Sequence, residues 1–423
     1  MAYCLIFVHV GVHGGQVAVG KYLDRRGCEA QAEPMMNRTA NGMMEEGAKD
    51  GDLTAAGRLD WLRLIRSENV GPIIFQQLLA RYGTAAAALR ALPELARRGG
   101  RRRAIKQCST AAAEAELAAA AAVGARPLAS CEAAYPPRLA ALPDPPPLIY
   151  VLGDVARLAR PAVAMVGARN ASASAIRYTR RLAGDLGRKG LLVASGLARG
   201  IDTAAHTGAL DGGAGGGTMA VLAGGVDVVY PAENQALYEA IVSQGAVISE
   251  MPPGTRPQAR HFPRRNRLIS GLALGVIVIE AAERSGSLIT ARFALEQGRE
   301  VFAVPGSPMD PRCRGSNRLI RQGAILIQDA DEVVEVIEPM ITQPAMWEGA
   351  AGPMQAETGG MPQVRESDQD RQRLTALLGP TAVGVDELIR LSELTPAVVI
   401  TILLELELAG RLDRHAGNRV SIS

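Results

Sequence analysis

Short runs of apolar residues alternate with amphipathic stretches through the middle of the chain. The runs, rich in valine, isoleucine, leucine and alanine, lie at 148–152, 163–166, 191–194, 219–223, 247–249, 276–279 and 301–304. A helical pattern such as 288–297 lies between successive runs. Continuous apolar runs bounded by turns indicate strands buried on both faces, and their alternation with helices indicates βαβ units. The pattern predicts a Rossmann-like, doubly wound, mostly parallel α/β sheet over residues 126–340.

The stretch 53–125 is alanine-rich and shows helical periodicity. Trp61 and Leu62 lie on one amphipathic segment and Phe75 and Leu78 on the next, with Asn69-Val70-Gly71-Pro72 between them. A glycine-proline turn between two short helices is typical of a helix-hairpin-helix or SAM-like domain, whose turn backbone approaches a phosphate. A plain helical bundle fits equally well. The arginine run 97–103 is more typical of a solvated surface than of a DNA contact.

The end of the chain predicts a third domain. Residues 341–369 are rich in glycine, proline, methionine and glutamine, as linkers are. Helical patterns followed by a short hairpin then predict a winged helix over 370–423. Its candidate recognition helix, 396–409, carries only the charges of Glu405 and Glu407. Because acidic side chains repel a phosphate backbone, we expect this helix to contact protein or to serve structure instead of reading DNA.

Residues 1–52 differ from the rest of the chain. They contain scattered histidine, glycine and methionine residues without sustained periodicity. We therefore expect an N-terminal extension of poor order and a native start nearer Asp52, which N-terminal sequencing of the endogenous protein would test.

Two strand-to-helix turns carry the most informative chemistry. The first strand of the pair runs into a turn with Gly167 and Arg169, and the second runs into a turn with Ser195, Gly196, Arg199 and Gly200. In a parallel sheet both turns lie at the carboxyl edge, where helix N-termini present unpaired N–H groups. The two arginines add forked cations at that edge. These turns predict an anion site, most simply one for phosphate.

Known nucleotide-binding loops do not fit these turns. A G-x-G-x-x-G fingerprint starting at Gly167 requires glycine at positions 169 and 172, where the chain has Arg169 and Ser172. The G-x-x-x-x-G-K-[ST] loop of nucleoside triphosphatases does not occur in the sequence. The sequence therefore predicts no nucleotide cofactor.

A second group of polar side chains follows further along the chain. The stretch 263–271 reads as a basic loop before a helix. Its guanidinium, amide and hydroxyl groups could line a phosphate track, or could pair with Asp227, Glu233 or Glu250 and stiffen the loops. The candidate phosphate contacts from this region onward are Arg264, Arg265, Asn266, Arg267, Ser270, Gly271, Ser287 and Thr290.

Composition limits how a nucleic acid could be bound. Aromatic residues make up only 4% of the chain, so a long base-stacking platform is excluded and recognition must rely on phosphates. Tyr230 and Phe262 are the aromatic residues best placed to stack on a base, although packing under a loop is the commoner fate of such residues. The net charge of +3 is small, so a DNA site must be a local cluster.

The cysteines and hydrophobic segments indicate no metal, disulfide framework or membrane span. Five cysteines show no C-x-x-C pairing and no histidine at ligand spacing. The apolar run 4–10 is far short of the ~18 residues of a membrane span. We therefore expect a protein of the reducing cytoplasm.

Enzymatic readings are weak. Asp202, His206 and Ser195 could suggest a catalytic triad, but Ser195 lacks a G-x-S-x-G elbow, and an Asp–His pair at i, i+4 is an ordinary intrahelical pair. A stronger rival is a Rossmann-like enzyme that cleaves nucleoside monophosphates. Its P-G-G-x-G-T-x-x-E turn corresponds here to 285–291, which keeps Ser287 and Thr290 but has no acid at the position of the general base.

Three motifs together resemble the DNA-processing protein A (DprA/Smf) family. They are Met165 to Ser172, Ser195 to His206, and Pro263-Arg264-Arg265-Asn266-Arg267-Leu268-Ile269-Ser270-Gly271. The similarity extends over about residues 55–340. One departure is Arg199, where the family usually has lysine; arginine keeps the charge but changes the hydrogen-bond geometry.

The resemblance implies a function. Members of the family bind single-stranded DNA, protect it and help to load a RecA-type recombinase during natural transformation of competent cells. It implies a homodimer as well, and no residue in the sequence identifies the dimer or recombinase surface. We expect a cytoplasmic, non-enzymatic, single-stranded DNA binding protein without a cofactor. The alternative is a nucleotide-binding or nucleoside-monophosphate-cleaving Rossmann-like enzyme.

Overall fold

The computed structural model describes residues 12–13, 16–17, 52–213, 216–342, 367–415 and 417–422. The chain divides into two compact units, Met1–Gly47 and Ala48–Ser423. In the first unit, β1 (Val12–His13) pairs antiparallel with β2 (Gln16–Val17). The expectations about order in 1–52 and about the linker 341–369 concern residues that lie almost entirely outside the described ranges.

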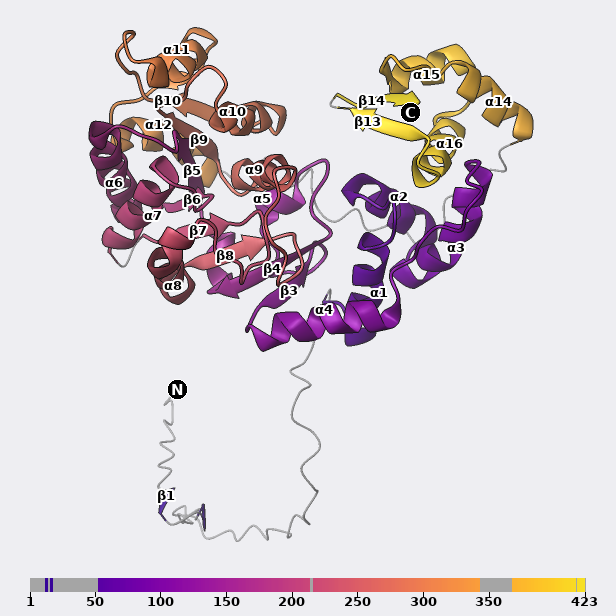
Figure 1. Cartoon of the computed structure of the whole chain (residues 1–423), viewed down its shortest axis with the longest axis horizontal. Helices are drawn as coiled ribbons and strands as arrows, with labels where there is room; N and C mark the ends of the chain where they lie inside the picture. Colours follow the sequence, from indigo (N-terminus) through magenta and orange to yellow (C-terminus); the bar gives the residue numbers. More distant parts are fainter. Residues whose placement is uncertain are drawn as a thin grey trace, which may run out of the picture. The chain divides into compact units, whose positions relative to one another are not determined.

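A nine-stranded sheet forms the centre of the second unit (Figure 1). Its strands are β3 (Arg126–Ala129), β4 (Leu148–Gly153), β5 (Ala162–Gly167), β6 (Leu192–Ser195), β7 (Thr218–Val221), β8 (Ala246–Ser249), β9 (Gly275–Ile279), β10 (Glu300–Ala303) and β11 (Ile325–Leu326). They are ordered β11-β10-β9-β5-β6-β7-β8-β4-β3. All neighbours pair in parallel except β8–β4 and β4–β3. The predicted doubly wound, mostly parallel sheet is confirmed.

Helices cover both faces of the sheet. One face packs against α6 (Ala173–Arg188), α7 (Ile201–Asp211) and α12 (Ala330–Thr342), and the other against α5 (Pro137–Ala140), α9 (His261–Gly271) and α10 (Gly286–Glu296). Helix α8 (Gln235–Gln244) packs beside α7, and α11 (Arg314–Arg321) follows β10. The two layers are visible on either side of the strands in Figure 1. The expectation of a basic loop at 263–271 was wrong, because these residues form helix α9 itself.

The N-terminal helices form a small domain against the β3–β4 end of the sheet. They are α1 (Ala55–Ile65), α2 (Pro72–Tyr82), α3 (Ala85–Arg98) and α4 (Thr110–Ala122). The Trp61 indole donates to the Pro147 carbonyl at 2.7 Å, and the Tyr150 hydroxyl donates to Glu116 at 2.6 Å. In the arginine run, Arg97 pairs with Glu94 and Arg101 with Glu68. These pairs fit the expectation that the run is mainly a solvated surface.

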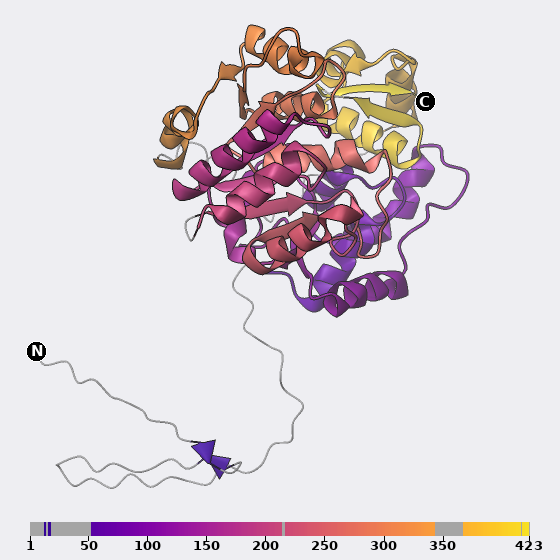
Figure 2. The same ribbon diagram turned by 60° about the vertical axis from the view of Figure 1, so that its left-hand side comes forward.

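The C-terminal residues form the predicted winged helix. It consists of α14 (Asp368–Ala376), β12 (Val383–Gly384), α15 (Val385–Ser392), α16 (Pro396–Leu408), β13 (Leu412–His415) and β14 (Arg419–Ile422). The three strands form an antiparallel sheet in the order β12-β14-β13. Seen from the angle of Figure 2 as well as that of Figure 1, this domain lies beside the N-terminal helices.

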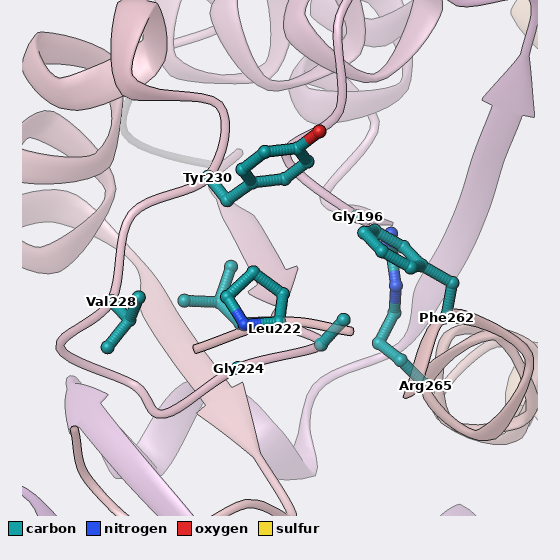
Figure 3. A pocket seen from close by; sticks show the side chains of 9 residues that line it. Gly196, Leu222, Gly224, Val228, Tyr230, Phe262 and Arg265 are labelled. Carbon is teal, nitrogen blue, oxygen red and sulfur yellow. The ribbon is translucent and has the colours of Figure 1, made fainter. Parts of the chain in front are cut away.

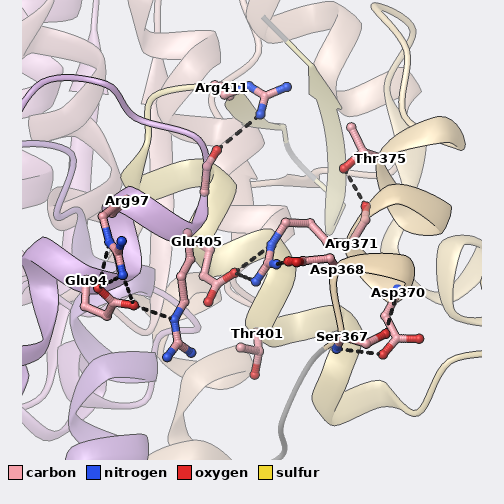
Figure 4. A network of polar contacts seen from close by, with 12 residues as sticks. Glu94, Arg97, Ser367, Asp368, Asp370, Arg371, Thr375, Thr401, Glu405 and Arg411 are labelled. Carbon is pink, nitrogen blue, oxygen red and sulfur yellow. Dashed lines mark hydrogen bonds and ion pairs between the residues drawn. The ribbon is translucent and has the colours of Figure 1, made fainter.

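The candidate recognition helix α16 packs against α3 of the helical domain. Leu404 and Leu408 belong to the same buried cluster as the cores of α1 to α3. The Asn69 amide donates to the Leu408 carbonyl at 3.0 Å. Glu405 is fully buried, and Arg371 binds its carboxylate at 2.7 Å (Figure 4). The acidic helix therefore contacts protein, as its charge predicted.

Gly99 provides a test of this contact. A Cβ atom at this position would lie 2.0 Å from the Glu405 carbonyl oxygen, a backbone atom that cannot move alone. We predict that Gly99→Ala lowers the free energy of unfolding by about 1–3 kcal/mol, the usual cost of overpacking. Urea unfolding measures it. Gly384→Ala is the matched control, because its Cβ would meet nothing within 4 Å. Equal stability of the two variants would contradict the α3–α16 contact.

Among the described residues, no helix is both long enough and apolar enough to cross a membrane.

Candidate nucleic-acid interface

The two predicted turns meet at the carboxyl edge of the sheet. The Ile201 amide at the start of α7 donates to the Ala168 carbonyl of the first turn at 3.2 Å. Gly200 has a φ of +74°, and a Cβ there would lie 2.3 Å from the same carbonyl oxygen. Gly167 is equally confined, with the Ile279 carbonyl 1.9 Å from its hypothetical Cβ. Glycine is thus required at both positions for the turns to touch.

A narrow pocket opens beside the second turn (Figure 3). Its lining includes Gly196 from the turn after β6, Tyr230 from the stretch after β7, and Phe262 and Arg265 from α9. The free volume of about 10 Å³ is that of a single water molecule. The pocket is therefore too small to enclose a nucleotide, and Tyr230 in its lining is 52% exposed.

Arg265 lies in the wall of this pocket with its guanidinium against Gly196. The side chain comes so close that a Cβ at Gly196 would lie 1.2 Å from its Nη1 atom. Arg265 is only 6% exposed, and its Nε has no hydrogen-bond partner among the described residues. Burial lowers the pKa of Arg265 to about 10, partly opposed by the Asp202 carboxylate. Such a cation is desolvated and incompletely satisfied, which favours an anion as its partner.

Two arginines flank one aromatic ring. The guanidinium carbons of Arg169 and Arg265 lie 5.2 Å and 5.9 Å from the centroid of the Phe262 ring, within the range of cation–π contacts. Tyr230 meets the same ring edge-on at 6.0 Å. The predicted residues Arg169, Arg265, Tyr230 and Phe262, distant in sequence, are thus brought together.

A buried network holds the second turn in place. The Asp202 carboxylate accepts from the amides of Gly196 at 3.2 Å and Ala198 at 3.3 Å. His206 Nε2 accepts from the Leu197 amide at 3.2 Å, and its Nδ1 lies 2.6 Å from the Thr218 hydroxyl. Leu197 has a φ of +56°, a conformation that costs energy for leucine unless such contacts hold it.

This network excludes the catalytic triad. The Ser195 hydroxyl donates to the Met165 carbonyl at 2.6 Å, and His206 uses both ring nitrogens elsewhere. Burial lowers the pKa of His206 to about 3, with a further contribution from the Arg265 charge. His206 is therefore a neutral acceptor under the turn and not a base at its surface. Sequence reasoning weighed His206 as a catalytic residue or as an ordinary intrahelical partner of Asp202, and missed its hydrogen bond to the Leu197 amide of the turn.

Several other predicted residues lie elsewhere. The Arg267 guanidinium donates to the Asp144 carbonyl at 2.7 Å and pairs with Glu250, so the structural alternative holds for it. Ser270 and Gly271, at the end of α9, are buried, and a Cβ at Gly271 would lie 2.7 Å from Leu142. These three residues do not reach the pocket because they face the opposite side of the helix from Arg265.

The remaining predicted contacts are not part of the pocket lining. Arg264 is exposed, and the Asn266 amide donates to the Gly286 carbonyl at 3.4 Å at the start of α10. On α10, Ser287 and Thr290 are 8% and 1% exposed. Arg199 pairs through both nitrogens of its fork with Glu233, and both side chains are more than half exposed. Solvent screens the attraction between Arg199 and Glu233. Glu233 would therefore compete only weakly with a phosphate for Arg199.

One group of described residues has metal-ligand chemistry. Ligand atoms of Glu280, Asp310 and Cys313 lie within 4.8 Å of one another. However, the Glu280 carboxylate already accepts from the amide and hydroxyl of Ser172, and Asp310 accepts from Arg312 at 2.7 Å. With both carboxylates engaged, the group does not resemble an open metal site.

The fold and the edge pocket define a Rossmann-like protein with a helix-hairpin-helix domain before the sheet and a winged helix after it. Family profiles match these three parts in order. The profile of DNA recombination-mediator protein A matches residues 126–338, the DprA-like N-terminal HHH domain matches 55–119, and the DprA winged helix domain matches 360–418. The chain belongs to the DprA family, which confirms the resemblance.

Individual relatives agree with this assignment. The chain is 46% identical to DNA processing protein DprA of Bacillus subtilis over 48% of its length and 67% of the relative. It is 39% identical to protein Smf of Escherichia coli over 68% of its length and 75% of the relative. The crystal structure of DNA processing protein A from Streptococcus pneumoniae superimposes with a TM-score of 0.56 at 35% identity, covering 67% of this chain and 98% of that one.

The buried His206 predicts a particular pH dependence of stability. Its pKa is about 3 in the folded protein, against roughly 6.5 when unfolded. The unfolded state therefore binds more protons between these values, and stability falls as the pH drops below about 6.5. His206→Gln, which never ionises, should show a flatter decline between pH 6.5 and 4 in unfolding titrations.

Asp202 contributes with the opposite sign, because burial raises its pKa and its contribution to stability falls as the pH rises. Asp202 is present in both the wild-type protein and the His206→Gln variant. The difference between their pH-dependent losses of stability therefore reports His206 alone. Substitution of the exposed His415 by Gln is the matched control for replacing a histidine outside the buried network. An unaltered decline in His206→Gln would show that His206 is not held neutral.

Proposed function

We propose that the protein binds single-stranded DNA across the mouth of the edge pocket. The observation that carries this proposal is the buried Arg265 guanidinium, incompletely satisfied and stacked with Phe262 at the carboxyl edge of the sheet. Its remaining donors suit a phosphate, and the exposed ring of Tyr230 suits a neighbouring base. The exposed Arg169 and Arg264 extend the positive charge on either side.

The proposed site is smaller than the set predicted from sequence. It consists of Arg169, Gly196, Arg264, Arg265, Tyr230 and Phe262, with Gly167 and Gly200 shaping the two turns and Arg199 and Asn266 at the periphery. Ser195, Ser287 and Thr290 are buried and are not part of it. Gly196 allows the arginine to approach, and Asp202 and His206 hold the turn. We leave out Arg267, Ser270 and Gly271, because they serve the interior of the fold.

We further propose that the protein acts without catalysis and delivers its strand to a RecA-type recombinase during transformation, as a homodimer. Family membership supports this part. The nucleotide-cleaving alternative needs a carboxylate free to act as a base near the start of α10. The acids nearest to that turn in sequence are Glu280, Glu283 and Glu296, none of them at the position of the general base, and Glu280 is engaged with Ser172. No observation in the structure favours that alternative.

Competition and salt dependence together test the function. A stiff duplex should not fit across the turns, so single strands should compete far better than duplex of the same length. For single strands, log K falls with log salt by about 0.7 per phosphate contact. Arg169→Ala should weaken binding and make the slope shallower by about 0.7. Arg181→Ala, an exposed arginine on α6, is the charge-matched control. Equal competition by duplex would refute the proposal.

The Arg199–Glu233 pair yields a prediction of opposite sign. Replacing Glu233 by Gln removes a negative charge beside the DNA path and releases Arg199. Glu233→Gln should therefore strengthen single-strand binding severalfold in low salt, and the gain should shrink as salt screens it. A fluorescence anisotropy titration measures the effect. The double variant Arg199→Ala/Glu233→Gln should lose most of the gain; if it keeps all of it, Arg199 does not contact the strand.

A further inference from the structure

A second and larger cavity opens at the same edge of the sheet, on the other side of the first turn. Strands β5 and β9 are neighbours in the sheet. After β5 the chain continues to β6 on one side, and after β9 it continues to β10 on the other side. The two connections therefore diverge and leave a crevice between them. Its volume is about 540 Å³, within the range of small-molecule sites. The turn 167–172 separates it from the edge pocket, with Arg169 facing Phe262 and Ser172 lining the cavity.

The walls of the cavity are apolar at one side and rich in acceptors at the other. Ile279 and Ile327 are buried beneath it, and the side chain of Tyr178 lies along α6. Glu280, Asp310 and the Gln328 side chain supply oxygen atoms. A flat, uncharged ring with N–H donors matches this combination.

The start of α6 does not offer its donors to an anion in the cavity. The position that a phosphate would take at the start of α6 is already filled, because Glu280 accepts from the Ser172 amide at 2.8 Å and from its hydroxyl. Asp310 and Arg312, which also line the cavity, form an ion pair at 2.7 Å. A negative group at the start of α6 would therefore meet the Glu280 carboxylate, a like charge.

The backbone at Glu280 directs its carboxylate into this position. Glu280 has a φ of +46°, unusual for a residue that is not glycine, directly after the last residue of β9. Such conformations persist where the surrounding structure enforces them, often at ligand sites. Two of the roughly four acceptor positions of the carboxylate remain after Ser172 is satisfied.

The distance from the DNA site is short. Arg169 and Ser172 are three positions apart in the chain, so the backbone between them spans at most about 10 Å. A strand advances about 3.4 Å per stacked nucleotide, so a base within about three nucleotides of the Arg169 phosphate can reach the cavity. We propose that the cavity receives a nucleobase of the bound single strand, turned inward while its phosphates stay outside.

This inference rests on the proposed DNA-binding function and adds a base preference to it. Carboxylate acceptors suit the amino groups of cytosine, adenine and guanine, whereas thymine has no amino group. Strands rich in cytosine should therefore bind more tightly than strands of thymine. A free nucleoside carries the same base and could also bind in the cavity. The experiment must therefore distinguish binding of a free nucleoside from binding of a base within a strand.

Ser174→Trp tests the site. Ser174 is exposed, lines the cavity and lies on the first turn of α6, so an indole there fills the space from outside the core. Ala173→Trp is the matched control, one residue earlier, exposed and not part of the lining. Each protein is titrated with oligo-dC, with oligo-dT and with a strand of the same length that lacks bases.

In the wild-type protein and Ala173→Trp, the ratio of affinities for oligo-dC and the baseless strand should be high. In Ser174→Trp this ratio should fall by about tenfold, within the range known for one stacked base, while the affinity for the baseless strand stays unchanged. The preference for oligo-dC over oligo-dT should also fall. An unchanged ratio, or an equal loss for both strands, would overturn the proposal.

Deoxycytidine alone is titrated in parallel. Binding of the nucleoside that Ser174→Trp abolishes, combined with an unchanged strand ratio, would assign the cavity to a free nucleoside and refute the strand assignment. Failure of the DNA-binding function is separate: it would appear as an Arg169→Ala variant that binds the baseless strand as well as the wild-type protein does.

Discussion

The burial of one guanidinium group is the constraint on which this protein depends. Arg265 is almost completely removed from water, which costs energy unless the charge is compensated. The nearby Asp202 supplies an opposite charge, but the Arg265 Nε finds no partner among the described residues. The Arg265 guanidinium packs directly against the backbone of residue 196, which leaves no space for a Cβ atom. Glycine is therefore required at this position. The incomplete compensation leaves the site suited to an external anion.

The same constraint explains the polar network beneath the turn. Asp202 binds two amides of the turn and also faces Arg265, so one carboxylate both shapes the turn and balances the cation. His206 can hold the Leu197 amide only while its Nε2 is unprotonated. Its burial secures that state at neutral pH. Residues that resemble a catalytic set in sequence therefore act as supports for the second turn.

Sequence periodicity predicted the fold well because buried parallel strands leave continuous apolar runs. It predicted the site less well, and α9 shows why. Arg264, Arg265 and Arg267 lie within four residues, yet one is exposed, one lies in the pocket and one pairs with Glu250. On a helix, neighbouring residues point about 100° apart, so the three must have different surroundings. The sequence suggested a loop there, in which all three could have faced one strand.

The charge of α16 shows where sequence alone was sufficient. Its acidic residues predicted a contact with protein, and Glu405 lies buried against Arg371 while neighbouring leucines join the core of the helical domain. A buried pair of this kind adds little net stability, but leaving either partner alone is costly. The pair therefore disfavours arrangements in which Glu405 is buried without Arg371. With its recognition helix packed against α3, the winged helix does not present α16 to a DNA groove, which agrees with the proposal that single strands bind at the edge of the sheet.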